Sequence, residues 1–267
     1  MSDKFQAKPE KTVYFNKEAF KENNYTSIRW LGHYGMFLNS RGTTIMVDPV
    51  IVGYDLPLLI EMPVECKDID KLDAILITHS DNDHLSKETL EETKDVTNSY
   101  HGPHYVSEVI KELGYDNSYG SDIYESFNIN NVNVKLTPAD HAWQNSSSKY
   151  NRVFKQEDFC GFYFNTPDGS IWVPGDSRLM EEQLNFEEPD VILFDFSDNP
   201  WHIGFENAIR LANNYPNSIL IPAHWGTVDA WDRNVFNGDP KDLFDRVTNP
   251  ERIKVLNPGE EFILKKE

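Results

Sequence analysis

Short apolar runs of strand length, separated by polar turns, mark the first third of the chain. They cover residues 27–31, 36–39 and 43–47, and a fourth run, LDAILIT at 72–78, is almost continuously apolar. An unbroken apolar run of this length predicts a strand that is covered on both faces. The charged segment 86–94 consists of good helix formers and predicts the helix that follows this strand.

The second half of the chain shows the same alternation without repeating the sequence. Strands are predicted at 132–137, 159–165, 170–173, 191–194 and 219–221, and helices at 205–213 and 243–247. Strands that alternate with helices, with hairpins at both ends, predict an α/β fold in which sheets are sandwiched by helices. Because no linker rich in Gly, Ser or Pro divides the chain, we expect one domain over 1–267, of which 1–25 form a polar N-terminal extension.

Composition and charge restrict the partners. Hydrophobic residues make up 39% of the 267 residues, so the chain can bury a core and is not a disordered tail. The formal net charge of −19 repels nucleic-acid backbones and anionic bilayers, and no Lys/Arg-rich run offsets it. We therefore expect no nucleic-acid partner. The most apolar stretch, 50–60, is interrupted by Asp55 and Pro57 and is too short for stable membrane insertion.

Cysteine usage and the N-terminus point to a cytoplasmic protein. Cys66 and Cys160 are the only cysteines and belong to no regular motif, so we expect two buried free thiols in a reducing compartment. The first fifteen residues are polar and charged, without the apolar core of a signal peptide.

Histidines and aspartates gather where predicted strands end. The ligand-type residues are His79, Asp81, Asp83 and His84 after 72–78, His141 after 132–137, Asp176 after 170–173 and His224 after 219–221. Ligands of layered α/β folds bind beyond the carboxyl ends of the strands. Imidazole and carboxylate groups at four such ends predict a polynuclear site for zinc, manganese or iron. The alternative is that the SDND sequence at 80–83 caps the following helix.

Spacing within the first cluster favours two metal ions. In an extended loop, positions 79, 81 and 83 can point to one side, whereas the adjacent side chains of Asp83 and His84 diverge. Divergence suits two ions a few ångströms apart, each taking ligands from the same loop.

The order of these motifs resembles the metallo-β-lactamase superfamily. The resemblance rests on His-x-Asp-x-Asp-His at 79–84, a later His, Gly-Asp at 175–176 and His-Trp-Gly at 224–226, and it extends over 27–227. The sequences WLGH at 30–33, VDP at 47–49, WHIG at 201–204 and IPAHWGT at 221–227 are similar to one branch. That branch holds the ascorbate-phosphate lactonases and the N-acylphosphatidylethanolamine phospholipase D relatives.

The resemblance implies an αββα sandwich with a dinuclear site. It places His79, Asp81 and His141 at the first metal, Asp83, His84 and His224 at the second, and Asp176 between the two. It also implies a bridging hydroxide as nucleophile. Asp83 and His202 count as catalytic residues, His202 at the rim, where it donates a proton to the leaving group or holds the substrate.

Position 81 departs from the family, which usually has His there. An aspartate oxygen keeps a ligand of similar reach. Asp81, Asp83, Asp176 and a hydroxide would together balance two divalent ions, so we expect a harder site that favours manganese or iron and attracts anionic substrates less. The competing interpretation is that Asp81 caps the next helix and the first metal is lost.

Further residues have two interpretations each. His33 and Asp48 either orient metal ligands or form a buried pair. Trp143, Trp225 and the loop 50–64 either line a substrate pocket or belong to the core. His101 and His104, beside Gly102-Pro103, are interpreted as solvated loop histidines.

These patterns together predict a metal-dependent hydrolase of a small-molecule substrate, either a lactone or similar ester or a small phosphoester. Phospholipase-type relatives carry an Arg two residues after the Trp that follows the third His; here Asn145 stands there, which disfavours a lipid phosphodiester. The alternative is a non-catalytic or single-metal member of the fold that binds or senses a ligand. The sequence does not fix the oligomeric state, and a homo-oligomer remains one alternative.

Overall fold

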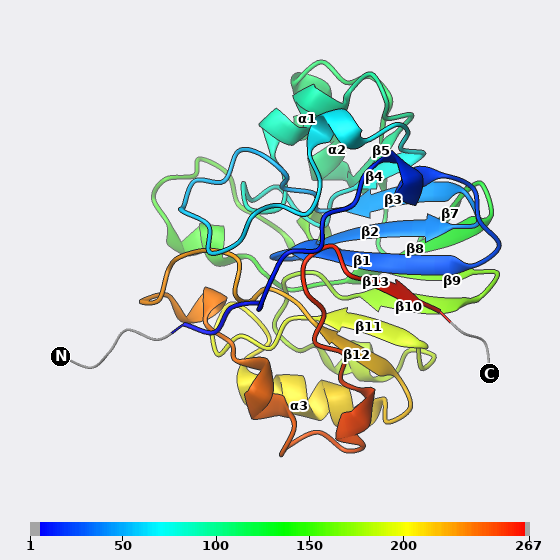
Figure 1. Cartoon of the computed structure of the whole chain (residues 1–267). Coiled ribbons are helices and arrows are strands. Elements are labelled where there is room, and N and C mark those ends of the chain that lie inside the picture. The colour runs from blue at the N-terminus through cyan, green and yellow to red at the C-terminus, as the bar shows by residue number, and fades with distance from the viewer. Residues whose placement is uncertain (1–5, 265–267) are drawn as a thin grey trace.

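Two β-sheets lie face to face, with helices on their outer faces (Figure 1). The computed structural model describes residues 6–264. The first sheet has the order β13 (Glu261–Ile263), β1 (Thr26–Gly32), β2 (Gly35–Ser40), β3 (Thr43–Val47), β4 (Ala74–Leu76), β5 (Tyr100–Pro103), β6 (Ser118–Ser121). The second has the order β12 (Ile219–Pro222), β11 (Val191–Phe194), β10 (Gly169–Val173), β9 (Cys160–Thr166), β8 (Val132–Pro138), β7 (Ser126–Ile129).

Three α-helices within residues 6–264 complete the sandwich. α1 (Lys87–Thr93) and α2 (His104–Glu112) lie on the first sheet, and α3 (Phe205–Asn214) lies at the opposite side of the molecule on the second (Figure 1). Short 3-10 helices occupy Lys17–Phe20, Cys66–Asp68, Trp143–Ser146, Gln156–Asp158, Glu181–Leu184, Asn234–Phe236, Pro240–Leu243 and Pro250–Arg252. The predicted αββα architecture is confirmed.

Two layers of apolar side chains hold the sandwich together. Trp30 and Ile45 from the first sheet share one buried cluster with Phe162 and Trp172 from the second, so this cluster joins the sheets. The other face of the first sheet packs against α1 and α2 through a separate cluster. Burial on both faces explains why several strands read as nearly continuous apolar runs.

The strands predicted from apolar runs all form, with ends that agree within two residues, but the predicted helix at 243–247 is wrong. A single 3-10 turn, Pro240–Leu243, is followed by turns. Five residues are too few to recover the cost of helix nucleation without a well-packed face, and Phe244 is 41% exposed.

The interpretation of His101 and His104 as loop histidines is also wrong. His101 lies in β5, its ring stacked 4.4 Å from Phe127, and His104 is the first residue of α2. Gly102 lies between them in the sheet. A side chain would not fit at this position, because a Cβ there would lie 2.6 Å from the carbonyl oxygen of Ile77. Glycine thus permits close packing at this position and does not mark a turn.

The segment predicted as a polar N-terminal extension packs on the sheet over its described part. Phe15 and Phe20 contact Phe37 of β2, with ring centroids 5.6 and 4.6 Å away. Residues 1–5 lie outside the described residues. Cys66 and Cys160 are both buried and free, as predicted.

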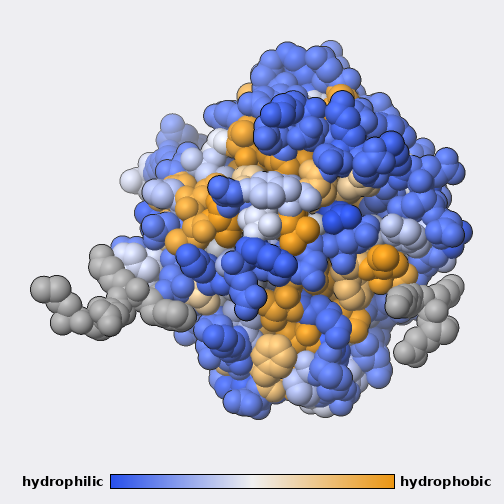
Figure 2. Space-filling model, in the orientation of Figure 1, coloured by the Kyte–Doolittle hydropathy of each residue, from blue (hydrophilic) through white to orange (hydrophobic). Residues whose placement is uncertain are grey.

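The surface is largely hydrophilic. Figure 2 shows hydrophobic residues as separate patches among hydrophilic ones on the face drawn. Within residues 6–264, no helix is both long and apolar enough to cross a membrane.

Candidate metal centre

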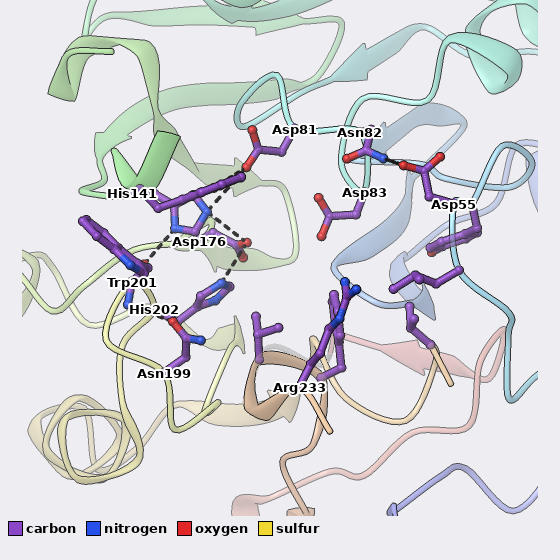
Figure 3. A pocket seen from close by; sticks show the side chains of 16 residues that line it. Asp55, Asp81, Asn82, Asp83, His141, Asp176, Asn199, Trp201, His202 and Arg233 are labelled. Carbon is purple, nitrogen blue, oxygen red and sulfur yellow. Dashed lines mark hydrogen bonds and ion pairs between the residues drawn. The ribbon is translucent and has the colours of Figure 1, made fainter. Parts of the chain in front are cut away.

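The loops after β4, β8, β10 and β12 bring all seven predicted ligands into one cluster. Figure 3 shows Asp81, Asp83, His141 and Asp176 directed into the same cavity from different loops. Three groups of these ligand atoms, His79–Asp81–His141, His79–His84–Asp176 and His33–Asp83–His84–His224, each fit within 4.8 Å. The sequence prediction of a shared site at the strand ends therefore agrees with the geometry.

Backbone conformation at these strand ends is unusual. His33, Asp48 and His224 have φ angles of 50°, 44° and 62°, in the left-handed region that residues other than glycine seldom adopt. Gly175, just before Asp176, has φ 75°, and a Cβ there would lie 2.4 Å from the carbonyl oxygen of Cys160. Such strained positions cluster at functional sites, where the surrounding structure holds them.

Asp176 is the hub of the cluster. Its Oδ2 lies 3.1 Å from His84 Nε2 and 3.4 Å from His224 Nε2. The Nε2 atoms of His202 and His141 lie 3.7 and 3.8 Å from the same oxygen. Four imidazole nitrogens thus converge on one oxygen of a buried carboxylate.

Asp81 lies beside His79 and His141. Its Oδ2 is 3.5 Å from His79 Nε2 and 3.7 Å from His141 Nε2. Trp143 Nε1 donates to Oδ2 and Gln144 Nε2 donates to Oδ1, each at 2.7 Å. The carboxylate does not cap α1, because the N-cap of that helix is Ser86, whose side chain accepts from the Thr89 amide. The capping interpretation of Asp81 is therefore wrong.

Asp83 lies beside His33. Their side chains are in contact at 3.2 Å from His33 Nε2 to Asp83 Oδ2. Burial, together with the nearby His224, lowers the pKa of His33 to about 4. A neutral His33 can thus donate a hydrogen bond to Asp83 and orient its carboxylate.

The ring nitrogens of the predicted histidine ligands are used in one consistent way. Each Nδ1 has a protein partner within 3.0 Å: Thr78 Oγ1 for His79, Asp48 Oδ2 for His84, Trp201 O for His141 and Val235 O for His224. The Nε2 atoms of His79, His84 and His224 are buried with no hydrogen-bond partner, as is Asp176 Oδ1. Buried polar atoms without partners are costly, and imidazoles fixed through Nδ1 are typical of metal ligands. The donor set fits divalent metal ions.

The electrostatic field of the cluster favours positive charge. Burial by itself would lower the pKa of His84 and of His224. The neighbouring carboxylates outweigh burial, since Asp176 and Asp48 raise the pKa of His84 well above its usual value, and Asp176 raises that of His224 to about 9. A group of acidic side chains with this effect on imidazoles also stabilises a bound cation.

Asp48 is the partner that orients His84. It accepts hydrogen bonds from the Thr78 amide at 2.7 Å, from Thr78 Oγ1 at 2.6 Å and from His84 Nδ1 at 2.8 Å.

We expect Asp48→Asn to weaken metal affinity by about 10- to 100-fold, as for other partners of metal-bound imidazoles. Titration against a competing chelator measures this. The control is Asp73→Asn, a buried carboxylate that accepts from the Thr44 amide at the other end of β4. Equal affinities of Asp48→Asn and the unmodified protein would contradict the assignment.

A pocket of about 500 Å³ opens onto the cluster (Figure 3). Its lining is mainly aromatic and acidic and comprises Tyr54, Asp55, Leu56, Asp81, Asn82, Asp83, His141, Trp143, Asp176, Asn199, Trp201, His202, Val228, Arg233, Val235 and Phe236. Of the two interpretations, pocket lining holds for Trp143 and for residues 54–56 of the 50–64 loop, whereas Val50, Ile51 and Val64 belong to the core. Trp225 does not line it; its ring stacks on Trp30 in the core, with centroids 5.5 Å apart.

Sequence reasoning missed three residues near the site. Gln144 holds Asp81, and Arg233 lines the pocket. Asp195 Oδ2 contacts His202 Nδ1 at 2.7 Å. Asp195 directly follows the strand 191–194, so the strand-end rule that found the other residues would also have found it. Arg233 lies in an irregular loop, where no pattern marks it.

Comparison with known proteins identifies the family. The family described as "Beta-lactamase superfamily domain" matches residues 43–225, more than half of the chain, and the chain belongs to it. A "UPF0173 metal-dependent hydrolase" of Caldivirga maquilingensis is 27% identical over 247 residues, covering 87% of this chain and 96% of the relative. A relative of the same description from Bacillus cereus is 23% identical over 240 residues, covering 89% and 99%.

Solved structures share the fold. Igni18, a metallo hydrolase from Ignicoccus hospitalis, has a TM-score of 0.70 at 19% identity and covers 91% of this chain and 99% of its own. An isothiocyanate hydrolase from Delia radicum gut bacteria has a TM-score of 0.71 at 16% identity, with coverage of 88% and 98%. The family match and the relatives described as metal-dependent hydrolases identify the chain as a metal-dependent hydrolase with the metallo-β-lactamase fold.

Proposed function

We propose that this enzyme is a dinuclear metallohydrolase that cleaves a lactone or similar ester, or a small phosphoester. The observation that carries the proposal is the single oxygen of Asp176 with four imidazole Nε2 atoms within 3.8 Å. Asp81 lies beside His79 and His141, and Asp83 belongs to a second group of donors with His84 and His224.

Each set suits one divalent ion. His79, Asp81 and His141 would hold the first, Asp83, His84 and His224 the second, and Asp176 would serve both. When bound, two such ions supply a hydroxide nucleophile near neutral pH and polarise the substrate's carbonyl or phosphoryl oxygen. The carboxylate at position 81 makes the set richer in oxygen and favours manganese or iron alongside zinc.

His202 would interact with the leaving group of the substrate. Its Nδ1 is fixed at 2.7 Å from Asp195 Oδ2, and Asp195 is itself held by the amide and hydroxyl of Ser197. This leaves Nε2 facing the pocket beside Asp176, where the doubly protonated imidazole would donate a proton to the departing oxygen and the neutral imidazole would accept a hydrogen bond from the substrate. A carboxylate behind the imidazole fixes the tautomer, as in other acid–base pairs.

Removal of His202 is expected to slow the reaction without removing metal. His202→Ala should lower kcat about 100-fold or more, the usual contribution of a positioned acid, and Asp195→Asn should lower it less. Metal content and kcat are measured on the same preparations. Loss of a metal equivalent in His202→Ala would instead make His202 a ligand, since His202, Asp176 and His141 also lie close enough together to bind an ion.

Elemental analysis followed by a substrate panel tests the proposed function. Two metal equivalents per chain, with hydrolysis of lactones, esters or small phosphoesters that chelation abolishes, are expected. One equivalent after reconstitution with excess zinc, manganese and iron would contradict the dinuclear site. Two equivalents without activity on any member of the panel would contradict the substrate assignment. A cytoplasmic location remains a prediction of the sequence.

A further inference from the structure

Arg233 differs from every other arginine of the chain. Of the eight arginines, six form ion pairs with carboxylates: Arg29 with Glu261, Arg41 with Asp168, Arg152 with Asp158, Arg178 with Asp140, Arg210 with Glu181 and Arg246 with Glu206. Arg252 is buried and donates to four backbone carbonyls, those of Ala212, Tyr215, Ser218 and Thr248. Within residues 6–264, the Arg233 guanidinium alone has neither kind of partner.

This arginine is also the cationic side chain of the pocket. The other charged residues in the lining are Asp55, Asp81, Asp83 and Asp176. Figure 3 shows Arg233 rising from its loop with the guanidinium directed into the cavity, toward the side on which Asp83 lies. Within residues 6–264, Arg233 forms no ion pair with Asp55, whose carboxylate accepts a hydrogen bond from Asn82. Arg233 is an exposed residue, so its guanidinium is open to an anion that enters from solvent.

The loop that carries Arg233 is tied to the predicted metal ligands. Val235 O is 2.8 Å from His224 Nδ1, and the Phe236 ring stacks on the His224 ring at 5.6 Å with an interplanar angle of 8°. The Phe236 amide donates to the Arg233 carbonyl oxygen at 3.1 Å. The backbone that carries the Arg233 side chain is therefore held in a fixed position relative to His224.

We propose that Arg233 binds an anionic group of the substrate, a carboxylate or a phosphate, away from the bond that is cleaved. The inference rests on the proposed function and narrows its substrate class to esters, lactones or phosphoesters with a second, negatively charged substituent. A planar guanidinium binds either anion through two parallel hydrogen bonds. The aromatic side chains of Tyr54, Trp143, Trp201 and Phe236 line the same pocket and suit the apolar body between the two ends.

The carboxylate at position 81 led us to expect weaker attraction of anionic substrates, and this subsite changes that expectation. Three aspartates and a hydroxide balance two divalent ions, so the predicted metal site itself attracts an anion weakly. Recognition of the anion then falls to a separate cation, which contacts the substrate but not the reacting atoms. Arg233 is therefore a specificity-determining residue, and its loss should act on KM more than on kcat.

Three matched aryl esters test the proposal. All are 4-nitrophenyl esters with the same five-carbon acyl chain, and the chain ends in a carboxylate, a primary amide or a phosphate. In Arg233→Gln, KM for either anionic ester should rise about 10- to 100-fold, the usual loss for one charge-assisted contact. kcat and the kinetics of the amide ester should stay unchanged, and Arg233→Lys should lie between. A larger effect on the carboxylate or on the phosphate ester identifies which anion the subsite takes.

Arg210→Gln is the matched control, because Arg210 is an exposed arginine on α3 paired with Glu181. No change in Arg233→Gln, or equal loss for the amide and anionic esters, would overturn the anion subsite while the proposed hydrolysis stands. If none of the three esters is cleaved, calorimetric binding of glutarate and glutaramate to the metal-loaded protein still decides. An Arg233-dependent preference for glutarate supports the subsite, and equal binding overturns it.

Discussion

His84→Ala and Asp176→Ala should each abolish hydrolysis, lowering kcat/KM by about four orders of magnitude, as removal of one member of a catalytic unit does in other enzymes. Asp176 Oδ2 is the point on which four imidazole nitrogens converge, and His84 Nε2 is the nearest of them, at 3.1 Å. Removing either leaves the remaining donors unable to hold both ions. The measurement is kcat/KM on a substrate from the panel, together with metal content and circular dichroism.

Two further variants separate chemistry from folding. Asp176→Asn keeps the shape of the buried side chain while removing its charge, so it should lose activity even where the alanine variant fails to fold. His104→Ala is the control, since His104 is an exposed histidine paired with Asp122, outside the pocket lining. Full activity of folded His84→Ala and Asp176→Ala would show that the site has been assigned to the wrong residues.

Asp81→Ala should reduce the bound metal from two equivalents to one. The carboxylate lies between His79 and His141, whose Nε2 atoms are 3.5 and 3.7 Å from its Oδ2, so its loss removes one of three ligands from the first set. The second set around Asp83 and His84 keeps all its members. Elemental analysis after reconstitution and gel filtration measures the result. Two equivalents retained in Asp81→Ala would mean that Asp81 is held only by Trp143 and Gln144 and is not a ligand.

Gln144→Met should weaken the binding of the metal ion beside Asp81 without removing one of its ligands. Gln144 is fully buried and donates to Asp81 Oδ1, which leaves Oδ2 as the oxygen that faces the two histidines. Its loss leaves Trp143 Nε1 as the remaining donor to the carboxylate, so Asp81 is held less firmly and the affinity for one of the two proposed ions should fall by about 10- to 100-fold. Asn39→Ala is the control, a buried amide on β2 that donates to the Ala19 and Lys21 carbonyls far along the sheet. An equal fall in both variants would indicate general destabilisation.

Local signals explain which elements could be predicted. The strand 191–194 is apolar at every position because both of its faces are covered, and this pattern depends on the residues alone. Helix α2 escaped prediction because Gly102 and Pro103 just before it resemble a turn. The closeness of Gly102 to the Ile77 carbonyl, which explains that glycine, involves a residue 25 positions away.

The residue patterns by themselves determined that sheets are sandwiched by helices, which strand ends carry the chemistry and which seven residues converge there, and the family resemblance implied the αββα order. The patterns could do so because strand ends of a layered sheet meet at one edge, so the order of the motifs along the chain already implies their proximity. Only the tertiary structure decided how those residues are held. That Asp81 is fixed by Trp143 and Gln144, that Asp195 stands behind His202, and that Arg233 faces the pocket without a partner are contacts between segments distant in sequence. Such contacts depend on side-chain packing across loops, which leaves no periodic signal in the chain.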